Sequence, residues 1–198
     1  MIRIARAADV PSILDIYAPY VRGTTITFEY TVPSPDAFRD RFASITERFP
    51  WLVWEEQGEI LGYAYASLPF ERAAYAWCAE PSIYLRDDAR RRGIGRRLYA
   101  ALETLLSQMG YQVNFAIITG ENRASLAFHE ALGYQKCAEM VKCGMKFGRW
   151  LDVIWLEKRL NPVEIPSNFP IAWREFGKDV QKIKNILGKM SLSESPKV

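Results

Sequence analysis

The sequence predicts a mixed α/β domain in which strands outnumber helices. Short runs rich in β-branched and aromatic residues recur through the first half of the chain, and a strand–helix–strand crossover follows in the second half. Of the 198 residues, 49% are hydrophobic and 25% are charged, which is typical of a folded globular protein. This length suits one domain with an appendage.

The N-terminal quarter is expected to hold one strand and two helices. Residues 2–4 predict a short strand, and Asp9 can cap a helix that carries apolar residues at helical spacing. Residues 24–30 are rich in β-branched and aromatic side chains and predict a loop or strand over the site. Ser34 and Pro35 start a second helix, with serine as the cap and proline in the first turn.

Three further strands are expected next, and they give the first half of the sheet an antiparallel character. Residues 51–54 and 60–67 predict two strands joined by a hairpin turn at Gln57-Gly58. Residues 75–85 predict a fourth strand that is broken by Pro81, since proline removes a donor from the ladder.

The second half predicts a crossover and the end of the sheet. Residues 93–109 carry leucines at helical spacing, and residues 113–118 form an almost fully apolar strand that suits the sheet centre. Asn122 or a neighbour caps a helix that runs to about residue 132. The remaining strands are expected at 135–142 and 150–158, around a turn at 144–148.

Residues 163–198 are expected to form a C-terminal extension. This segment is punctuated by proline up to Pro170 and then carries an apolar stripe over about 172–190, which predicts one amphipathic helix. The stripe is too short for a coiled coil, so we expect it to dock onto its own domain or onto a second subunit. Residues 191–198 are expected to fray.

A basic turn with two glycines joins the fourth strand to the third helix. Arg90 to Arg92 precede Gly93 and Gly95, and the helix begins directly afterwards. Exposed amides and the positive end of the helix dipole attract anions, and glycine lets the backbone approach them closely. The turn therefore predicts a pyrophosphate site. Because it is neither the dinucleotide fingerprint nor a P-loop, a turn that only caps a helix remains the alternative.

Composition excludes several other classes. The net charge of +3 is too small for a nucleic-acid-binding protein, and no apolar run reaches membrane-spanning length. The three cysteines, Cys78, Cys137 and Cys143, lack metal-ligand spacing, so we expect free thiols and no metal site. No leader-like segment opens the chain, and a cytoplasmic location is therefore expected.

Seven motifs, in the same order along the chain, resemble those of the GCN5-related N-acetyltransferase (GNAT) superfamily, and within it the phosphinothricin and methionine sulfoximine N-acetyltransferases. They are Thr27-Phe28-Glu29, Pro50-Trp51-Leu52-Val53, Arg72-x-x-Tyr75-x-Trp77-x-x-Glu80, the turn at 90–96, Asn122-x-x-Ser125, HEALGY at 129–134, and GxKxGxWxDV at 144–153. The resemblance covers residues 1–162. It implies the GNAT fold, a mixed central sheet that is splayed at the cofactor-binding strand and flanked by helices.

The resemblance implies acetyl-CoA as the acetyl donor. The main chain of residues 83–85 would pair with the pantetheine arm, the turn would hold the pyrophosphate, and Asn122 would bond the arm, with a plain helix cap as the alternative for Asn122. The donor-binding residues that it implies are Ile83, Tyr84, Leu85, Arg90, Arg91, Arg92, Gly93, Ile94, Gly95, Arg96, Asn122 and Ser125.

Two residues are candidates for proton transfer. Glu80 matches the family's base, because an α-amino acid enters as an ammonium and must lose a proton before it attacks the thioester. Trp77 and Pro81 beside it would raise the pKa of its carboxyl, and a solvated or salt-bridged glutamate is the alternative. His129, the only histidine, stands where many relatives have a tyrosine that acts as an acid toward the CoA thiolate; packing within its helix is the alternative.

The resemblance also implies an acceptor site. Arg72 would bind the acceptor carboxylate, Tyr75 and Phe28 would wall the pocket, and Glu29 would hold a polar group or the ammonium. Tyr84 is a further polar candidate, with a core aromatic as the alternative. An acid at Glu29 is found in relatives that act on methionine sulfone or sulfoximine, so it favours those acceptors without excluding phosphinothricin.

The function that follows is N-acetylation of the α-amino group of a small amino-acid analogue, by direct attack in a ternary complex. A different small amine is the first alternative, and a CoA-binding module that has lost catalysis is the second. The family implies a homodimer, and the apolar stripe of the extension supports that expectation.

Overall fold

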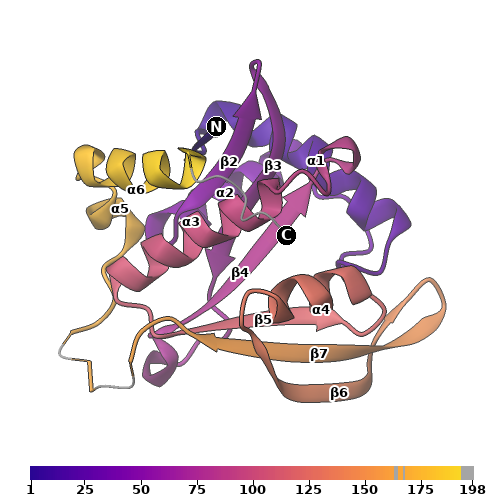
Figure 1. Cartoon of the computed structure of the whole chain (residues 1–198). Helices are drawn as coiled ribbons and strands as arrows, with labels where there is room; N and C mark the ends of the chain where they lie inside the picture. The colour runs from indigo at the N-terminus through magenta and orange to yellow at the C-terminus, as the bar shows by residue number, and fades with distance from the viewer. Residues whose placement is uncertain (163–164, 167, 193–198) are drawn as a thin grey trace.

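The computed structural model describes residues 1–162, 165–166 and 168–192, and in these ranges it shows a seven-stranded sheet with helices on both faces (Figure 1). The strand order is β1-β2-β3-β4-β5-β7-β6. The strands are β1 (Ile2–Ile4), β2 (Trp51–Glu56), β3 (Glu59–Ser67), β4 (Cys78–Leu85), β5 (Val113–Thr119), β6 (Gln135–Lys146) and β7 (Arg149–Arg159). The helices are α1 (Val10–Gly23), α2 (Pro35–Arg48), α3 (Ile94–Met109), α4 (Arg123–Glu130), α5 (Trp173–Phe176) and α6 (Val180–Leu192).

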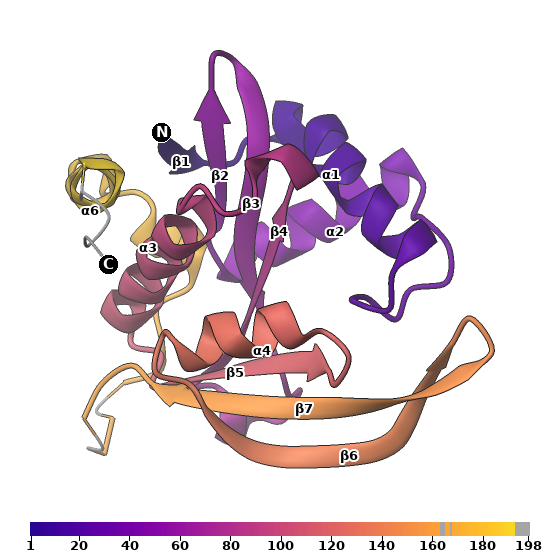
Figure 2. The same ribbon diagram turned by 45° about the vertical axis from the view of Figure 1, so that its right-hand side comes forward.

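The sheet splays in its middle. β4 and β5 form its parallel pair, and they meet only at Cys78 with Val113 and Ala79 with Asn114. Beyond Ala79 the two strands fan apart, so that β5, β6 and β7 leave the direction of β1 to β4 (Figures 1 and 2). The mixed α/β class with a splayed sheet is therefore confirmed.

The prediction that Pro81 breaks the fourth strand is wrong. β4 runs unbroken on its β3 side, where Pro81 stands opposite Ala66. The N–H of Arg86 donates to Leu61 O, so the even-numbered residues of β4 exchange hydrogen bonds with β3. Pro81 belongs to the odd-numbered set, and its missing N–H therefore removes nothing from that ladder. The strand also starts later than expected, at Cys78.

Other boundaries differ by a few residues. Asp9 does not cap α1 with its side chain; its carboxylate accepts from Arg6 N at 2.7 Å and from Arg3 Nη1 at 2.6 Å, and so closes a short 3-10 turn before the helix. β6 continues to Lys146, which leaves a tight turn at Phe147-Gly148 instead of a loop over 144–148. Ser34 caps α2 as predicted, since its side chain accepts from Ala37 N.

The two faces of the sheet bury different helices. α1 and α2 cover the face that carries Trp51, Val53 and Tyr63. α3 and α6 cover the opposite face, which carries Leu52 and Ala64. The alternation of these residues along β2 and β3 sorts them to the two sides, because successive strand residues point in opposite directions.

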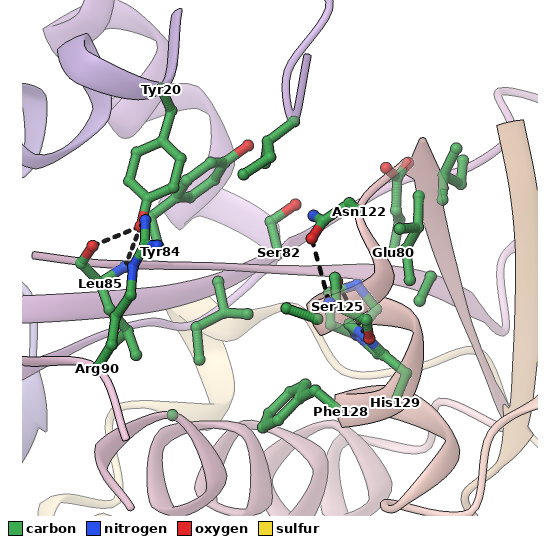
Figure 3. Close-up of a pocket in the computed structure, with 18 residues that line it drawn as sticks. Tyr20, Glu80, Ser82, Tyr84, Leu85, Arg90, Asn122, Ser125, Phe128 and His129 are labelled. Carbon is green, nitrogen blue, oxygen red and sulfur yellow. Dashed lines mark hydrogen bonds between the residues drawn. The ribbon is translucent and has the colours of Figure 1, made fainter. Parts of the chain in front are cut away.

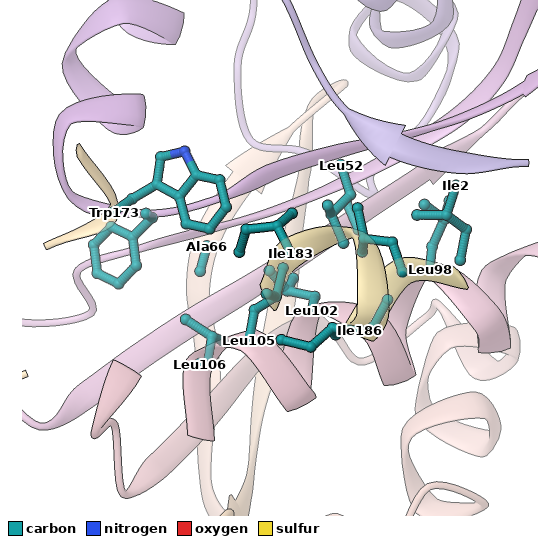
Figure 4. Close-up of a cluster of buried hydrophobic side chains, with 14 of the residues drawn as sticks. Ile2, Leu52, Ala66, Leu98, Leu102, Leu105, Leu106, Trp173, Ile183 and Ile186 are labelled. Carbon is teal, nitrogen blue, oxygen red and sulfur yellow. The ribbon is translucent and has the colours of Figure 1, made fainter. Parts of the chain in front are cut away.

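The C-terminal extension forms two helices where one was expected. α5 ends at Phe176, and α6 begins at Val180 after a turn at Gly177. Trp173, Ile183 and Ile186 pack into the cluster formed by α3 and the sheet (Figure 4). The extension therefore docks onto its own domain, which was one of the two alternatives. Fraying was expected over 191–198; α6 continues through residues 191 and 192, so the prediction is wrong for these two, and 193–198 lie outside the described residues.

We expect Ile183→Ala to destabilise the protein by about 2–4 kcal/mol, because it opens a cavity in a cluster where the side chain is 6% exposed. Urea unfolding followed by circular dichroism measures this change. Gln181→Ala, on the exposed side of α6, is the control and should stay within about 0.5 kcal/mol of the parent. Equal small effects of both variants would contradict the packing role of the extension.

Candidate active site

A cavity of about 250 Å3 opens where β4 and β5 separate. Its wall is built by residues of α1, β4, β5 and α4, together with the turn that leads into α3. Glu80 lies at one end of the cavity and Arg90 at the other, with Asn122 and Ser125 between them (Figure 3). The splay thus brings residues from both halves of the sheet around one space.

The exposed edge of β4 faces this cavity. Even-numbered residues pair with β3, so the N–H and C=O groups of Ile83 and Leu85 point toward β5. Within the described residues, β5 pairs with β4 only at Cys78 and Ala79, and so leaves the main chain of Ile83 available to an extended amide-containing ligand. The strand-like pairing expected for 83–85 is therefore possible at Ile83, whereas the main-chain groups of Leu85 bond the Tyr20 hydroxyl in this structure.

The N-terminus of α3 provides the anion-binding end. Gly93 precedes the helix with a positive φ of 76°, a conformation that glycine adopts without strain. The N–H of Arg97 donates to Gly93 O, so the amides of Ile94, Gly95 and Arg96 lie before that first turn of helical bonding. These amides and the helix dipole make a site for a pyrophosphate.

The arginines of the turn do not contribute equally. Arg90 lines the cavity, whereas Arg92 pairs with Glu56 at 2.6 Å on the β2–β3 hairpin. Arg91 is exposed, and Arg96 reaches Ala131 O at 3.5 Å. Of the three consecutive arginines, Arg90 is thus the one that the structure places against the donor cavity.

Glu80 is a half-buried carboxylate on β4. Its side chain lies on the same face of the sheet as Tyr65, since Ser67 stands opposite Glu80 and Tyr65 opposite Ser82. Burial raises the pKa of Glu80 to about 7, and in the described part of the chain no lysine or arginine forms an ion pair with it. This environment suits a proton acceptor at neutral pH, and it argues against the salt-bridged alternative.

His129 is held at both ring nitrogens. Its Nδ1 lies 2.7 Å from Ser125 O and its Nε2 2.8 Å from the hydroxyl of Tyr99, and its side chain is 3% exposed. With a proton on Nδ1, the ring donates to Ser125 O and accepts from Tyr99. Burial lowers the pKa of His129, so the neutral ring is favoured. This arrangement favours the packing alternative. The Ser125 hydroxyl lies 3.3 Å from His129 Nδ1, and Ser125 also lines the cavity.

Asn122 caps α4 and also lines the cavity. Its side-chain oxygen accepts from Ser125 N at 3.1 Å and caps the helix. The amide NH2 of the same side chain remains as a donor at the cavity wall (Figure 3). The cap and the donor-binding role proposed from the resemblance are therefore compatible.

The loop over the site is anchored by a buried lysine. Lys146, 1% exposed at the end of β6, donates to Val21 O at 2.9 Å and to Thr27 O at 2.7 Å. Phe28 from the same loop packs directly over Gly144 of β6, where a Cβ atom would lie 2.2 Å from its ring. The β6–β7 hairpin therefore fixes the position of this loop, including the acceptor-binding candidates Phe28 and Glu29.

Glu29 is not a free acid. It forms an ion pair with Arg41 of α2 at 2.7 Å, and both side chains are about one third exposed at 33% and 34%. Burial raises the pKa values of Tyr17 and Tyr65; the Glu29 carboxylate adds to the rise at Tyr17, and the Arg41 guanidinium opposes the rise at both. The sequence did not predict that Arg41 pairs with Glu29, because no local sequence pattern relates a residue of α2 to a loop residue twelve positions earlier.

Arg72 and Tyr75 lie outside the cavity wall. Both belong to the exposed connection between β3 and β4, where Tyr75 stacks on Phe70 with ring centroids 4.6 Å apart. Neither is among the described residues that line the cavity. Tyr20 and Phe128 do line the cavity, which the sequence analysis did not predict. An aromatic residue on an amphipathic helix can belong to the core or to a binding site, and the sequence pattern does not distinguish the two.

Comparison with known proteins identifies the family. Residues 2–155 match the family described as Acetyltransferase (GNAT) domain. The chain belongs to the GNAT acetyltransferase family. As a GNAT enzyme it takes its acetyl group from acetyl-CoA, and the open main chain at Ile83, the amides after Gly93 and the Arg90 guanidinium fit that donor.

Several relatives share most of the chain. A phosphinothricin N-acetyltransferase of Alcaligenes faecalis is 36% identical over 162 residues, which cover 81% of this chain and 82% of the relative. An L-methionine sulfoximine/L-methionine sulfone acetyltransferase of Pseudomonas paraeruginosa is 39% identical, with 81% of this chain and 95% of the relative covered. The resemblance to these N-acetyltransferases is therefore confirmed.

A solved structure confirms the GNAT fold. The phosphinothricin acetyltransferase of Sinorhizobium meliloti in complex with AcCoA superposes with a TM-score of 0.81 at 36% identity, covering 85% of this chain and 94% of that one.

None of the helices in the described ranges combines the length and the hydropathy that a membrane crossing requires. The same ranges hold no group of three or more histidine, cysteine or carboxylate side chains arranged to bind a metal ion.

Gly144→Ala should raise the KM for the acceptor amine several-fold and leave the KM for acetyl-CoA unchanged. The new Cβ would lie 2.2 Å from Phe28 Cε2 and 2.5 Å from Phe28 Cζ, so the ring and its loop must shift. Steady-state kinetics with each substrate varied in turn measures the split. Gly188→Ala in α6, where a Cβ meets no atom within 4 Å, is the control. A parallel rise in both KM values would show that Phe28 is not specific to the acceptor.

Proposed function

We propose that this GNAT enzyme acetylates the α-amino group of a small amino acid whose side chain ends in a polar tetrahedral sulfur or phosphorus group. Methionine sulfone, methionine sulfoximine and phosphinothricin are the acceptors that the names of its relatives suggest. The observation that carries the proposal is Glu80, a half-buried carboxylate at one end of the donor cavity that forms no ion pair within the described residues. It lies on the sheet face that also carries Tyr65, toward the Glu29–Arg41 pair.

The proposed reaction is a direct transfer within a ternary complex. Glu80 takes a proton from the acceptor ammonium, and the free amine nitrogen forms a bond to the acetyl carbonyl carbon while the bond from that carbon to sulfur breaks. Acetyl-CoA supplies the activated acyl group as a thioester. The sulfur leaves with the electron pair, and the second proton lost by the new amide nitrogen goes to that thiolate, so that the products are the N-acetyl amino acid and the CoA thiol. The donors on the α4 side of the cavity are the Ser125 hydroxyl and the Asn122 amide.

The acceptor is recognised by complementary charges in this proposal. An amino acid is zwitterionic, and Arg41 keeps N–H donors beyond the one that meets Glu29. Arg41 can therefore hold an anionic or sulfonyl-type oxygen of the acceptor, while Phe28 supplies an apolar wall. Arg72 and Tyr75 remain proposed acceptor contacts, from the exposed turn that precedes β4.

We also propose that the enzyme is a cytoplasmic homodimer with a catalytic domain at 1–162 and an extension at 163–198. The apolar stripe of the extension no longer supports dimerisation, because it is buried on its own domain. The support comes from exposed apolar side chains around the β6–β7 hairpin, including Val141 at 67% and Trp150 at 62%. Sedimentation equilibrium tests this state, and a monomer at micromolar concentration contradicts it.

An acceptor panel tests the function directly. With acetyl-CoA saturating, thiol release should be fastest with methionine sulfone, methionine sulfoximine or phosphinothricin, and slower with unmodified methionine and with simple alkylamines. Arg41→Ala should raise the acceptor KM about tenfold or more while the acetyl-CoA KM stays unchanged. Faster turnover of an unrelated amine would replace the proposed acceptor, and CoA binding without any turnover would favour a binding module.

Glu80→Gln should lower kcat/KM most at neutral pH and remove its pH dependence around 7. In the parent enzyme kcat/KM rises with pH through about 7, because the carboxylate must be deprotonated to accept a proton. Glu130→Gln, on the exposed end of α4, is the matched control. A parent-like rise with pH in Glu80→Gln would remove the base assignment.

Glu80→Gln should also change how the free energy of unfolding depends on pH. The folded-state pKa of Glu80 is raised above its ordinary value of 4.5, so its contribution to stability is lost as the pH rises from about 4.5 to about 7. Glu80→Gln should therefore gain on the parent by on the order of 2–4 kcal/mol between pH 4 and pH 9. Urea unfolding at the two pH values measures this difference.

A further inference from the structure

Ion pairs hold three arginines in and beside the basic turn that leads into α3. The pairs are Arg86 with Glu59 and Asp88, Arg90 with Asp87, and Arg92 with Glu56. Glu56 ends β2 and Glu59 begins β3, so these two acids belong to the β2–β3 hairpin and not to the turn. The hairpin therefore competes with a bound anion for the positive charge of the turn.

The carboxylate of Glu56 is held in place by a second partner besides Arg92. Its Oε1 accepts from Trp54 Nε1 at 2.9 Å, while its Oε2 accepts from Arg92 Nη2 at 2.6 Å. Trp54 is a core residue of β2 at 6% exposure, and the Arg97 guanidinium of α3 lies 5.7 Å from its ring centroid. Trp54 therefore orients one oxygen of the carboxylate independently of the arginine on the other oxygen.

Arg92 is the movable partner of this pair. It lies between Arg91, which has a φ of 60°, and Gly93, which has a φ of 76°, and the anion-binding amides follow from Ile94 onward. Its side chain is 46% exposed, and a long arginine side chain has many rotamers available to it. Rotation about its own bonds therefore decides whether the guanidinium meets the hairpin or an anion at the start of α3.

The pair between Glu56 and Arg92 is weak enough to be exchanged. Both side chains contact solvent, and an exposed ion pair changes an equilibrium constant by at most about fivefold. A phosphate group carries more charge than a carboxylate and accepts two parallel bonds from a guanidinium. A bound donor can therefore take Arg92 from Glu56, but its affinity is lowered by what the broken pair contributed.

We propose that Glu56 is a positioning residue that limits donor affinity: its carboxylate holds Arg92 on the β2–β3 hairpin, and a phosphate group of acetyl-CoA must displace it to gain that arginine. Glu56 acts on the donor only through Arg92. The CoA product carries the same phosphates, so the limit also favours its release. The inference depends on the donor of the family and is independent of the acceptor proposed above.

The test measures CoA binding to Glu56→Gln in the full chain, by calorimetry in the absence of acceptor. Glutamine keeps an oxygen for Trp54 and loses the charge that holds Arg92, so CoA should bind about two- to fivefold more tightly. This gain should shrink at about 0.5 M salt, which screens exposed charges. A gain retained with dephospho-CoA assigns Arg92 to the pyrophosphate, and a gain lost assigns it to the 3′-phosphate. Unchanged or weaker CoA binding overturns the inference.

Two further variants separate the exchange at Arg92 from a change in overall charge. Glu59→Gln removes the same charge from the other side of the hairpin turn, but Arg86 keeps Asp88, so CoA affinity should change less than about twofold. Arg92→Ala should weaken CoA binding, and in that background Glu56→Gln should have no further effect. Equal gains in Glu56→Gln and Glu59→Gln, or a gain from Glu56→Gln that persists without Arg92, overturn the proposal.

Discussion

The site depends on one interruption of hydrogen bonding, the separation of β4 from β5 after Ala79. Pairing stops at Ala79 and Asn114, and the next odd-numbered residue of β4 is Pro81, which has no N–H to offer to β5. The cavity, the open main chain of Ile83 and the position of Glu80 beside the gap all follow from this geometry. A continuous sheet would bury the same residues without leaving space for a ligand.

Two kinds of charged side chain lie near the site. Some have polar partners and stabilise the structure, whereas Glu80 has no ion pair among the described residues. Lys146 satisfies two carbonyls, and Glu29 is paired with Arg41, so each of these buried or half-buried charges has a partner. Glu80 is different, because burial raises the pKa of its carboxyl to about 7 and no ion pair with it occurs in the described part of the chain. The fold thus tolerates an unfavourable carboxylate at the position of the proposed base, where proton affinity near neutrality would be useful.

Local signals in the sequence predicted the turn before α3 and the cap of α4. The turn before α3 contains Gly93 at positive φ, and Asn122 caps α4, so both features depend on residues close together in the chain. The hairpin turn at Gln57-Gly58 follows the same rule, since both residues have positive φ.

Contacts between distant segments could not be predicted in the same way. Tyr20 and Leu85 are 65 residues apart, and Lys146 reaches back to Val21 across 125 residues. Pro81 was misjudged for a related reason. Whether a proline interrupts a ladder depends on which neighbour its N–H side faces, and only the register of β3 against β4 decides that.

The extension adds a constraint that the family match over 2–155 does not contain. α6 packs against α3, and Leu98, Leu102, Leu105 and Leu106 of α3 are fully buried in the shared cluster (Figure 4). The same helix presents its N-terminal amides to the donor cavity at its other end. A helix is stiff along its axis, so packing by α6 restrains the position of the amides after Gly93 as well. The extension therefore stabilises the one helix that links the hydrophobic core to the anion-binding end of the site, although it contributes no residue to the cavity wall among those described.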